Sequence, residues 1–160
     1  MLKIDKNLIN AALHARNNAQ SPYSKYSVGA AVQSKSGAIY AGCNVERCSY
    51  TQTTHAEQNA IDNMIAAEGS VKIERIVIVA APADVRCALS DFENSIINTI
   101  MTGGCCGHCL QIIWENCYND TAVEIYFLRQ DATITATTIG TLLPYPFGPS
   151  DLGIYYGEII

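Results

Sequence analysis

The chain has 160 residues, a length that suits a single domain, 1–160, with one substantial core. Hydrophobic residues make up 49% of the chain and charged residues only 16%, so we expect apolar surface that an oligomer could bury. The formal net charge of −5 argues against a binding track for polynucleotide phosphates, which usually shows as a basic stripe.

The sequence predicts neither a membrane protein nor a secreted one. No segment reaches the roughly 18 consecutive apolar residues of a transmembrane helix. The first six residues lack the long apolar core of a signal peptide. Seven cysteines, an odd number, then indicate reduced thiols, some of them on a metal, and a cytoplasmic location.

The pattern of apolar residues predicts helices and strands along most of the chain. In chain order we expect a helix at 5–19, strands at 26–32 and 38–45, a helix at 54–67, a strand at 73–81, a helix at 107–115 and strands at 122–128 and 133–138. A hairpin turn at 34–37 would join the first two strands. This order is typical of an α/β fold in which helices pack on a mixed sheet of about five strands.

The stretch 82–104 fits this pattern least well. Residues 92–101 could form an extra short helix, closed by Gly103 and Gly104. The stretch could be a surface excursion near the functional site, or simply a longer connection. Loops of this length are often functional, but that is a general tendency and not an observation on this chain.

Two short segments, 55–57 (His-Ala-Glu) and 106–109 (Cys-Gly-His-Cys), stand at the starts of predicted helices. Cys106 and Cys109 are three residues apart, so both sulfurs can reach one ion from the first helical turn, and His55 can supply a third ligand. Thiolate and imidazole ligands favour Zn²⁺, one ion per subunit. Three protein ligands leave a coordination position for water, which is typical of catalytic zinc.

Glu57 lies two residues from His55 and is not needed as a ligand. Its carboxylate can point at the fourth coordination position, so we predict that Glu57 is the catalytic proton shuttle. Each short motif is weak by itself, because a Cys-x-x-Cys pair could be a redox pair or half of a structural site. We interpret His108 and Cys105 as non-ligands, since the helical geometry points them away from the ion.

Three further stretches resemble the cytidine deaminases, a family of zinc-dependent nucleoside deaminases. They are residues 21–31 (Ser-Pro-Tyr-Ser-Lys-Tyr-Ser-Val-Gly-Ala-Ala), 42–50 (Gly-Cys-Asn-Val-Glu-Arg-Cys-Ser-Tyr) and 142–152 (Leu-Leu-Pro-Tyr-Pro-Phe-Gly-Pro-Ser-Asp-Leu). With the zinc segments, the resemblance runs from the first helix to about residue 152 and leaves out only 82–104. It implies a three-layer α-β-α fold and a His-Cys-Cys zinc site.

The resemblance also implies residues that bind the substrate. Asn44 and Glu46 would hydrogen-bond the ribose hydroxyl, and two residues apart on a strand they would face the same way. Tyr26 stands where the family usually has a phenylalanine whose ring packs on the pyrimidine. The backbone N–H of Ala56 would bind the carbonyl of the base.

Assembly is implied in the same way. Single-domain members of the family are homotetramers with sites built across interfaces. Tyr50 and Phe147 resemble residues that reach the site of a neighbouring subunit. The apolar composition is compatible with such an assembly.

The chain departs from the family pattern around the metal. Many single-domain members have cysteine where His55 stands and arginine where Gln58 stands. Three thiolates leave the zinc site with a net negative charge that the arginine offsets, whereas two thiolates and a neutral histidine need no such partner. Cys105 replaces a proline that would fix the backbone before the ligand, and Leu110 replaces a usual arginine.

The sequence therefore predicts hydrolytic deamination of cytidine and 2′-deoxycytidine to the uridine products and ammonia, a reaction of pyrimidine salvage. One alternative is a deaminase for another cytosine nucleoside, such as an aminoacyl-nucleoside antibiotic. Another is a non-catalytic, zinc-stabilised binding protein, against which Glu57 argues. The acidic net charge disfavours a third, the editing of RNA or DNA.

Overall fold

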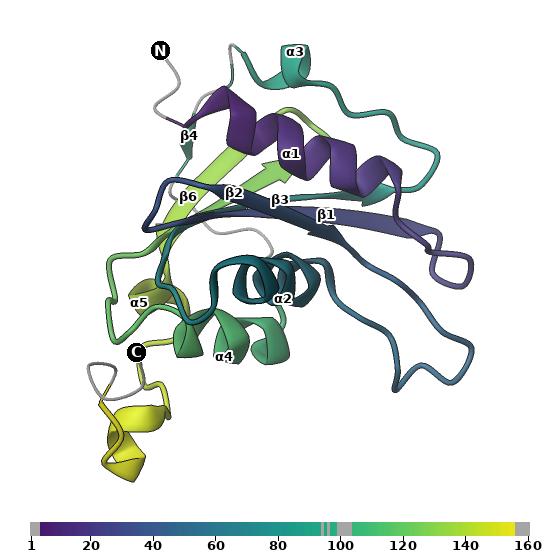
Figure 1. Ribbon diagram of the computed structural model, residues 1–160. Coiled ribbons are helices and arrows are strands. Elements are labelled where there is room, and N and C mark those ends of the chain that lie inside the picture. Colours follow the sequence, from purple (N-terminus) through teal and green to yellow (C-terminus); the bar gives the residue numbers. More distant parts are fainter. Residues whose placement is uncertain (1–3, 94, 96, 99–103, 156–160) are drawn as a thin grey trace.

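A computed structural model describes residues 4–93, 95, 97–98 and 104–155 of the chain (Figure 1). Its centre is a mixed six-stranded sheet in the order β2-β1-β3-β5-β6-β4. The strands are β1 (Tyr26–Ser34), β2 (Ile39–Cys43), β3 (Ile73–Pro82), β4 (Ile97–Asn98), β5 (Glu124–Arg129) and β6 (Ile134–Thr138). The central pair, β3 and β5, is parallel, and β1 runs antiparallel to both β2 and β3.

Helices cover both faces of the sheet, as expected for a three-layer α/β fold. Helix α1 (Lys6–Asn17) lies over one face, and α2 (Ala56–Glu68) and α4 (Gly107–Glu115) lie side by side under the other (Figure 1). Shorter elements are α3 (Leu89–Phe92), α5 (Ile139–Leu142) and the 3₁₀ turn η1 (Pro149–Leu152). No helix within the described part of the chain has the length and apolar character to cross a membrane.

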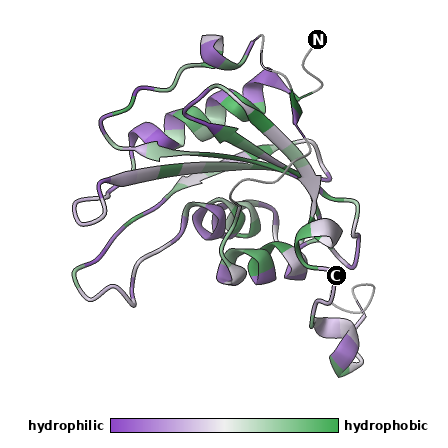
Figure 2. Cartoon of the chain, turned by 180° about the vertical axis from the view of Figure 1, so that it is seen from behind, coloured by the Kyte–Doolittle hydropathy of each residue, from purple (hydrophilic) through white to green (hydrophobic). Residues whose placement is uncertain are grey.

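The strands of the sheet contribute side chains to two hydrophobic cores, one on each face. Successive side chains of a strand point to opposite faces. On β3, Ile76 and Ile78 therefore join the core with α2 and α4, while Val77 and Val79 join the core with α1. Hydrophobic stretches accordingly gather on the strands and on the helices that flank them (Figure 2). Because both faces of β3 are buried, its sequence is a continuous apolar run rather than an alternating one.

Two glycines allow the helices to approach the sheet closely. A Cβ at Gly29 of β1 would lie 2.1 Å from the carbonyl oxygen of Ala12 in α1. A Cβ at Gly42 of β2 would lie 2.4 Å from the backbone nitrogen of Ala60 in α2. Both contacts are with helix backbone, which cannot move aside without displacing the helix.

The structure corrects two expectations. Among the described residues of 92–101 only Phe92 is helical, as the last residue of α3, and Ile97–Asn98 forms β4, which pairs in parallel with Ile134 and Thr135 of β6 at the edge of the sheet. Residues 94, 96 and 99–101 of that stretch lie outside the described residues, as do 102 and 103. Backbone hydrogen bonding to the open edge of β6 favours the extended conformation there. Strand β2 also ends at Cys43, two residues earlier than predicted.

Candidate active site

The two segments that carry the predicted zinc ligands lie at the N-termini of neighbouring helices. His55 is the N-cap residue of α2 and Cys106 is the N-cap residue of α4, and both have extended backbones with φ and ψ of −79° and 153° and of −70° and 161°. Cys109 follows in the first turn of α4. Since α2 and α4 lie side by side under the sheet, their starts bring these three side chains together (Figure 1).

The donor atoms of these residues match a tetrahedral metal site. Nδ1 of His55 lies 3.4 Å from Sγ of Cys106 and 3.3 Å from Sγ of Cys109, and the three donor atoms lie within 4.8 Å of one another. Tetrahedral zinc, with bonds of about 2.0 Å to nitrogen and about 2.3 Å to sulfur, holds such ligands about 3.6 Å apart. The residues therefore fit Zn²⁺ with one position left open.

The thiol of Cys109 is held in its protonated form when no metal binds it. Its side chain is buried, and burial, followed by the negative charge of Glu57, raises its pKa well above the ordinary value. A metal ion must displace that proton to bind the thiolate. Zinc binding would therefore release the proton of Cys109.

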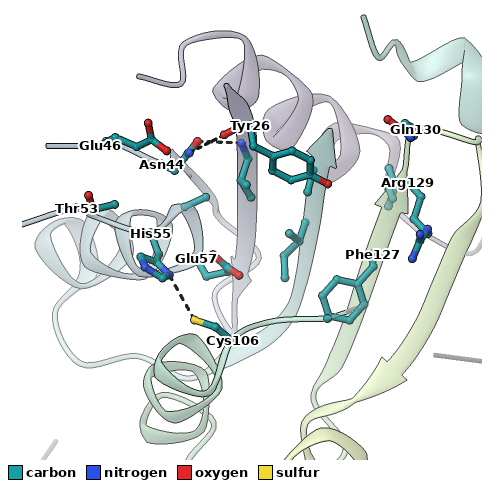
Figure 3. A pocket seen from close by; sticks show the side chains of 16 residues that line it. Tyr26, Asn44, Glu46, Thr53, His55, Glu57, Cys106, Phe127, Arg129 and Gln130 are labelled. Carbon is teal, nitrogen blue, oxygen red and sulfur yellow. Dashed lines mark hydrogen bonds between the residues drawn. The ribbon is translucent and has the colours of Figure 1, made fainter. Parts of the chain in front are cut away.

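Glu57 is buried, with 7% of its surface exposed, although it carries a carboxylate. It lies in the first turn of α2, beside His55 in the wall of the same cavity (Figure 3). The donor cluster consists of His55, Cys106 and Cys109, and the thiol of Cys105 turns instead to Glu57, to which it hydrogen-bonds. Burial of Cys105, together with the charge of Glu57 and this bond, raises the pKa of the thiol. The thiol is therefore a neutral donor to the carboxylate.

A cavity of about 790 Å³ opens beside the donor cluster (Figure 3). It is large enough for a small ligand. Its lining includes seven of the predicted site residues, which come from β1, the loop after β2, and the starts of α2 and α4: Tyr26, Asn44, Glu46, His55, Ala56, Glu57 and Cys106. The structure therefore brings two of the three metal donors, the buried carboxylate and four of the predicted substrate-binding residues around one space, while Cys109 lies outside its lining.

Asn44 and Glu46 lie in the loop after β2 and are held by backbone groups. The side chain of Asn44 accepts a hydrogen bond from the N–H of Val28 at 2.9 Å and donates one to the carbonyl of Tyr26 at 2.9 Å. The carboxylate of Glu46 accepts from the N–H of Tyr23 at 2.9 Å and of Ser24 at 3.2 Å. A hydrogen bond from the Ser24 side chain and these N–H groups lower the pKa of Glu46, so it is ionised at neutral pH.

Tyr26 and Ala56 line the cavity from different elements. Tyr26 begins β1 and is 44% exposed, which leaves its ring accessible from the cavity (Figure 3). Ala56 is the first residue of α2 and is buried. The first N–H groups of a helix have no partner inside it, and the helix dipole adds a partial positive charge there. That backbone N–H is thus suited to a carbonyl or anionic acceptor.

Tyr50 and Phe147 are not among the residues that line this cavity. Tyr50 is 71% exposed and lies in the loop after β2, where its ring packs at a tilt on that of Tyr23, with ring centroids 5.9 Å apart. It borders a smaller hollow that also includes Glu46 and His55. Phe147 is 61% exposed and precedes η1. Both rings are therefore available to another molecule.

Sequence reasoning missed the wall that the sheet contributes to the cavity. Phe127 and Arg129 of β5, Gln130 after it, and Ile78 and Ala80 of β3 all line the space. The signal was present in a general rule, because ligands in α/β sheets bind at the carboxyl ends of parallel strands, and β3 and β5 are the parallel pair. The sequence pattern predicted the strands but not which two of them would pair in parallel.

Comparison with known proteins places the chain among deaminases. Residues 2–125 match the family model described as the cytidine and deoxycytidylate deaminase zinc-binding region. A cytidine deaminase from Sporosarcina psychrophila is 34% identical over 145 residues, which cover 91% of this chain and 92% of that protein. One from Halalkalibacterium halodurans is 33% identical over 145 residues, with 91% and 95% covered.

Solved structures agree with this match. The crystal structure of cytidine deaminase from Burkholderia pseudomallei superimposes with a TM-score of 0.68 at 29% identity, covering 90% of this chain and 99% of that one. The enzyme from Mycobacterium tuberculosis gives a TM-score of 0.64 at 27% identity, covering 91% and 99%. A family match over most of the chain, relatives above 30% identity and the His-Cys-Cys donor cluster together mean that this chain belongs to the cytidine and deoxycytidylate deaminase family of zinc-binding hydrolases.

Proposed function

We propose that this chain hydrolyses cytidine and 2′-deoxycytidine to uridine and 2′-deoxyuridine with release of ammonia, as a cytoplasmic enzyme of pyrimidine salvage. Glu57 carries the proposal, because it is a buried carboxylate beside three metal donors and faces a cavity large enough for a nucleoside. A structural zinc site has no need of such a carboxylate. Relatives named cytidine deaminases support the choice of substrate.

Glu57 is the group that moves protons in this reaction. His55, Cys106 and Cys109 would hold a zinc ion, which would act as a Lewis acid and lower the pKa of a water molecule so that it is nucleophilic near neutral pH. Glu57 takes a proton from the attacking water and gives it to the ring nitrogen, then carries the second proton to the departing amine. One water is consumed and one ammonia leaves, so the carboxylate returns to its starting state.

The remaining cavity residues position the nucleoside. Asn44 and the ionised Glu46 lie where they can hydrogen-bond a ribose hydroxyl, and their bonds to backbone groups fix them before the substrate arrives. Tyr26 offers an aromatic face to the pyrimidine, and the N–H of Ala56 donates to the carbonyl of the base. Preorganised donors and acceptors of this kind lose little entropy on binding.

The proposed assembly is a homotetramer whose sites are shared between subunits. Tyr50 and Phe147 are exposed aromatic side chains outside the cavity of their own subunit, which is what residues that complete a neighbouring site require. The net charge of −5 is unsuited to the phosphates of a polynucleotide, so the substrate is a free nucleoside.

Substitution of Glu57 by alanine tests the proton-transfer role. We expect Glu57→Ala to retain zinc and to lose at least about 100-fold in kcat, the lower range for removal of a general acid-base group. Turnover is measured by the absorbance change of cytidine and zinc by elemental analysis. Asp62→Ala, which removes an exposed carboxylate from the same helix, is the matched control and keeps wild-type activity.

Two outcomes would contradict the proposal. Substantial deamination by zinc-loaded Glu57→Ala would remove the assigned role of the carboxylate. Wild-type protein that binds zinc yet leaves cytidine and 2′-deoxycytidine unchanged, while acting on another cytosine nucleoside in the same assay, would replace the proposed substrate.

A further inference from the structure

A second link joins the helix starts that carry the zinc ligands. Nε2 of His108, the second residue of α4, lies 3.2 Å from Oε1 of Gln58, the third residue of α2. A proton on that ring nitrogen is donated to the amide oxygen. The bond therefore connects the N-terminal turns of α2 and α4 by a route that does not pass through the metal.

The same histidine contacts a zinc ligand. The imidazole of His108 meets that of His55 edge to face, with ring centroids 5.3 Å apart and ring planes at 63°. His55 makes no capping hydrogen bond to α2 that would fix its ring. His108 does not belong to the donor cluster, so its contact with His55 is that of a neighbour and not of a fourth ligand.

The contacts of His108 with Gln58 and with His55 affect the metal site, because the metal ligands come from the same two helices. His55 belongs to the start of α2, and Cys106 and Cys109 to the start of α4. Any change in the separation of the two helix starts, or rotation of the His55 ring, changes the distances between Nδ1 and the two sulfurs. Contacts that orient a ligating histidine commonly control how tightly its metal is held.

We propose that His108 and Gln58 form a positioning pair that holds the His55 imidazole and the two helix starts in the zinc-binding geometry, and so slows the release of zinc. Neither residue lines the cavity, and His108 is not one of the metal donors. Gln58 orients His108 through the hydrogen bond, and His108 orients His55 through the ring contact. This inference rests on the zinc site of the proposed function, and it adds residues that act on the metal through a ligand.

The test is the rate at which zinc leaves the loaded enzyme for an excess of a chromophoric chelator. We expect His108→Ala and Gln58→Ala each to release zinc roughly tenfold faster than wild type. Because the two residues act through one bond, the double variant releases zinc no faster than His108→Ala alone. His108→Gln, which keeps an N–H donor on a long side chain, releases zinc more slowly than His108→Ala.

The matched control is His14→Ala. His14 is an exposed histidine on α1, on the opposite face of the sheet, so its removal leaves the rate of zinc release unchanged. Thermal unfolding of the zinc-free proteins separates an effect on the metal site from an effect on the fold. We expect the zinc-free His108→Ala and Gln58→Ala variants to melt within a degree or so of wild type, since loss of an exposed hydrogen bond changes stability little.

Several results would overturn the proposal. If His108→Ala and Gln58→Ala both release zinc at the wild-type rate, the pair has no positioning role, while the zinc site and the proposed reaction stay intact. Faster release matched by an equal loss of stability in the zinc-free protein would assign the pair to the fold. A wild-type protein that binds no zinc would remove the proposed function together with this inference.

Discussion

Among single residues, Cys105 shows how a departure from the family pattern can be accommodated. It stands where related sequences usually carry a proline before the first cysteine ligand, so the backbone there loses a fixed φ. In the structure the thiol packs against the core under the sheet and hydrogen-bonds Glu57. The side chain thus ties the segment before the ligand to the carboxylate that we propose as the proton shuttle.

Replacement of Cys105 tests this contact. We expect Cys105→Ala to lower kcat by roughly three- to tenfold at full zinc occupancy, because Glu57 loses a donor that holds its carboxylate in place. Cys105→Ser keeps a donor of similar size and should retain more of the activity. Steady-state kinetics with zinc determined in each preparation is the measurement, and equal kcat in Cys105→Ala and wild type would show that the contact has no role.

The site residues that could be predicted from sequence are those whose placement depends on local structure. The start of α2 carries His55 and Glu57, and the start of α4 carries Cys106 and Cys109. Within each helix start, the spacing of the residues fixes which side chains converge. Phe127 and Arg129 could not be predicted, because they reach the cavity through the parallel pairing of β5 with β3, a contact between distant parts of the chain. Pairing of this kind leaves no periodic signal in the sequence.

At the scale of elements, the packing of α2 on β2 fixes the position of the site. The backbone of α2 approaches Gly42 so closely that any Cβ there would collide with Ala60. Helix α1 approaches Gly29 on the opposite face in the same way. Of these two helices, α2 carries site residues and α1 carries none, so the two glycines offer a paired comparison between a helix that bears the site and one that does not.

The paired substitutions Gly42→Ala and Gly29→Ala should separate stability from zinc binding. We expect each to lower the free energy of unfolding by about 1–3 kcal/mol, the usual cost of inserting a methyl group into a packed interior. Gly42→Ala shifts α2 and therefore also weakens zinc binding, whereas Gly29→Ala shifts α1 and leaves it near the wild-type value. Denaturant unfolding and zinc competition are the measurements, and equal zinc affinity in the two variants would contradict the account.

The order and type of the long elements followed from the sequence, while their ends and the edge of the sheet did not. Helix α4 has the bounds expected from its apolar pattern, and α2 begins at the residue after His55. Strand β2 stops at Cys43 because the side chain of Asn44 bonds to the backbone of β1 and turns the chain out of the ladder. Only two residues of β4, Ile97 and Asn98, are among the described ones, and two residues are too few for a period-two pattern to show.

At the scale of the whole molecule, aromatic side chains near the C-terminus are exposed to solvent, and no contact within the described part of the chain accounts for their exposure. Tyr145 is 95% exposed and Phe147 is 61% exposed. The segment that bears them is nevertheless held on the enzyme, since the side chain of Gln111 in α4 donates to the carbonyl of Phe147 at 2.9 Å. A fixed backbone that presents apolar rings to solvent is typical of a surface that another protein chain covers.

The proposed sharing of sites predicts that two impaired variants regain activity when their subunits are mixed in one assembly. Phe147→Ala should lower kcat/KM at least about tenfold, since a buried aromatic contact is worth more than 1 kcal/mol. In a mixed assembly, a subunit with Phe147→Ala supplies an intact Glu57, and a neighbour with Glu57→Ala supplies the missing ring. The two variants expressed together should therefore have more activity than either variant alone, while Glu57→Ala expressed with the double variant should show no such gain.

Light scattering should give four copies of the 17.3 kDa chain. A fully active monomer, or co-expressed variants that gain nothing, would rule out sites shared through Phe147.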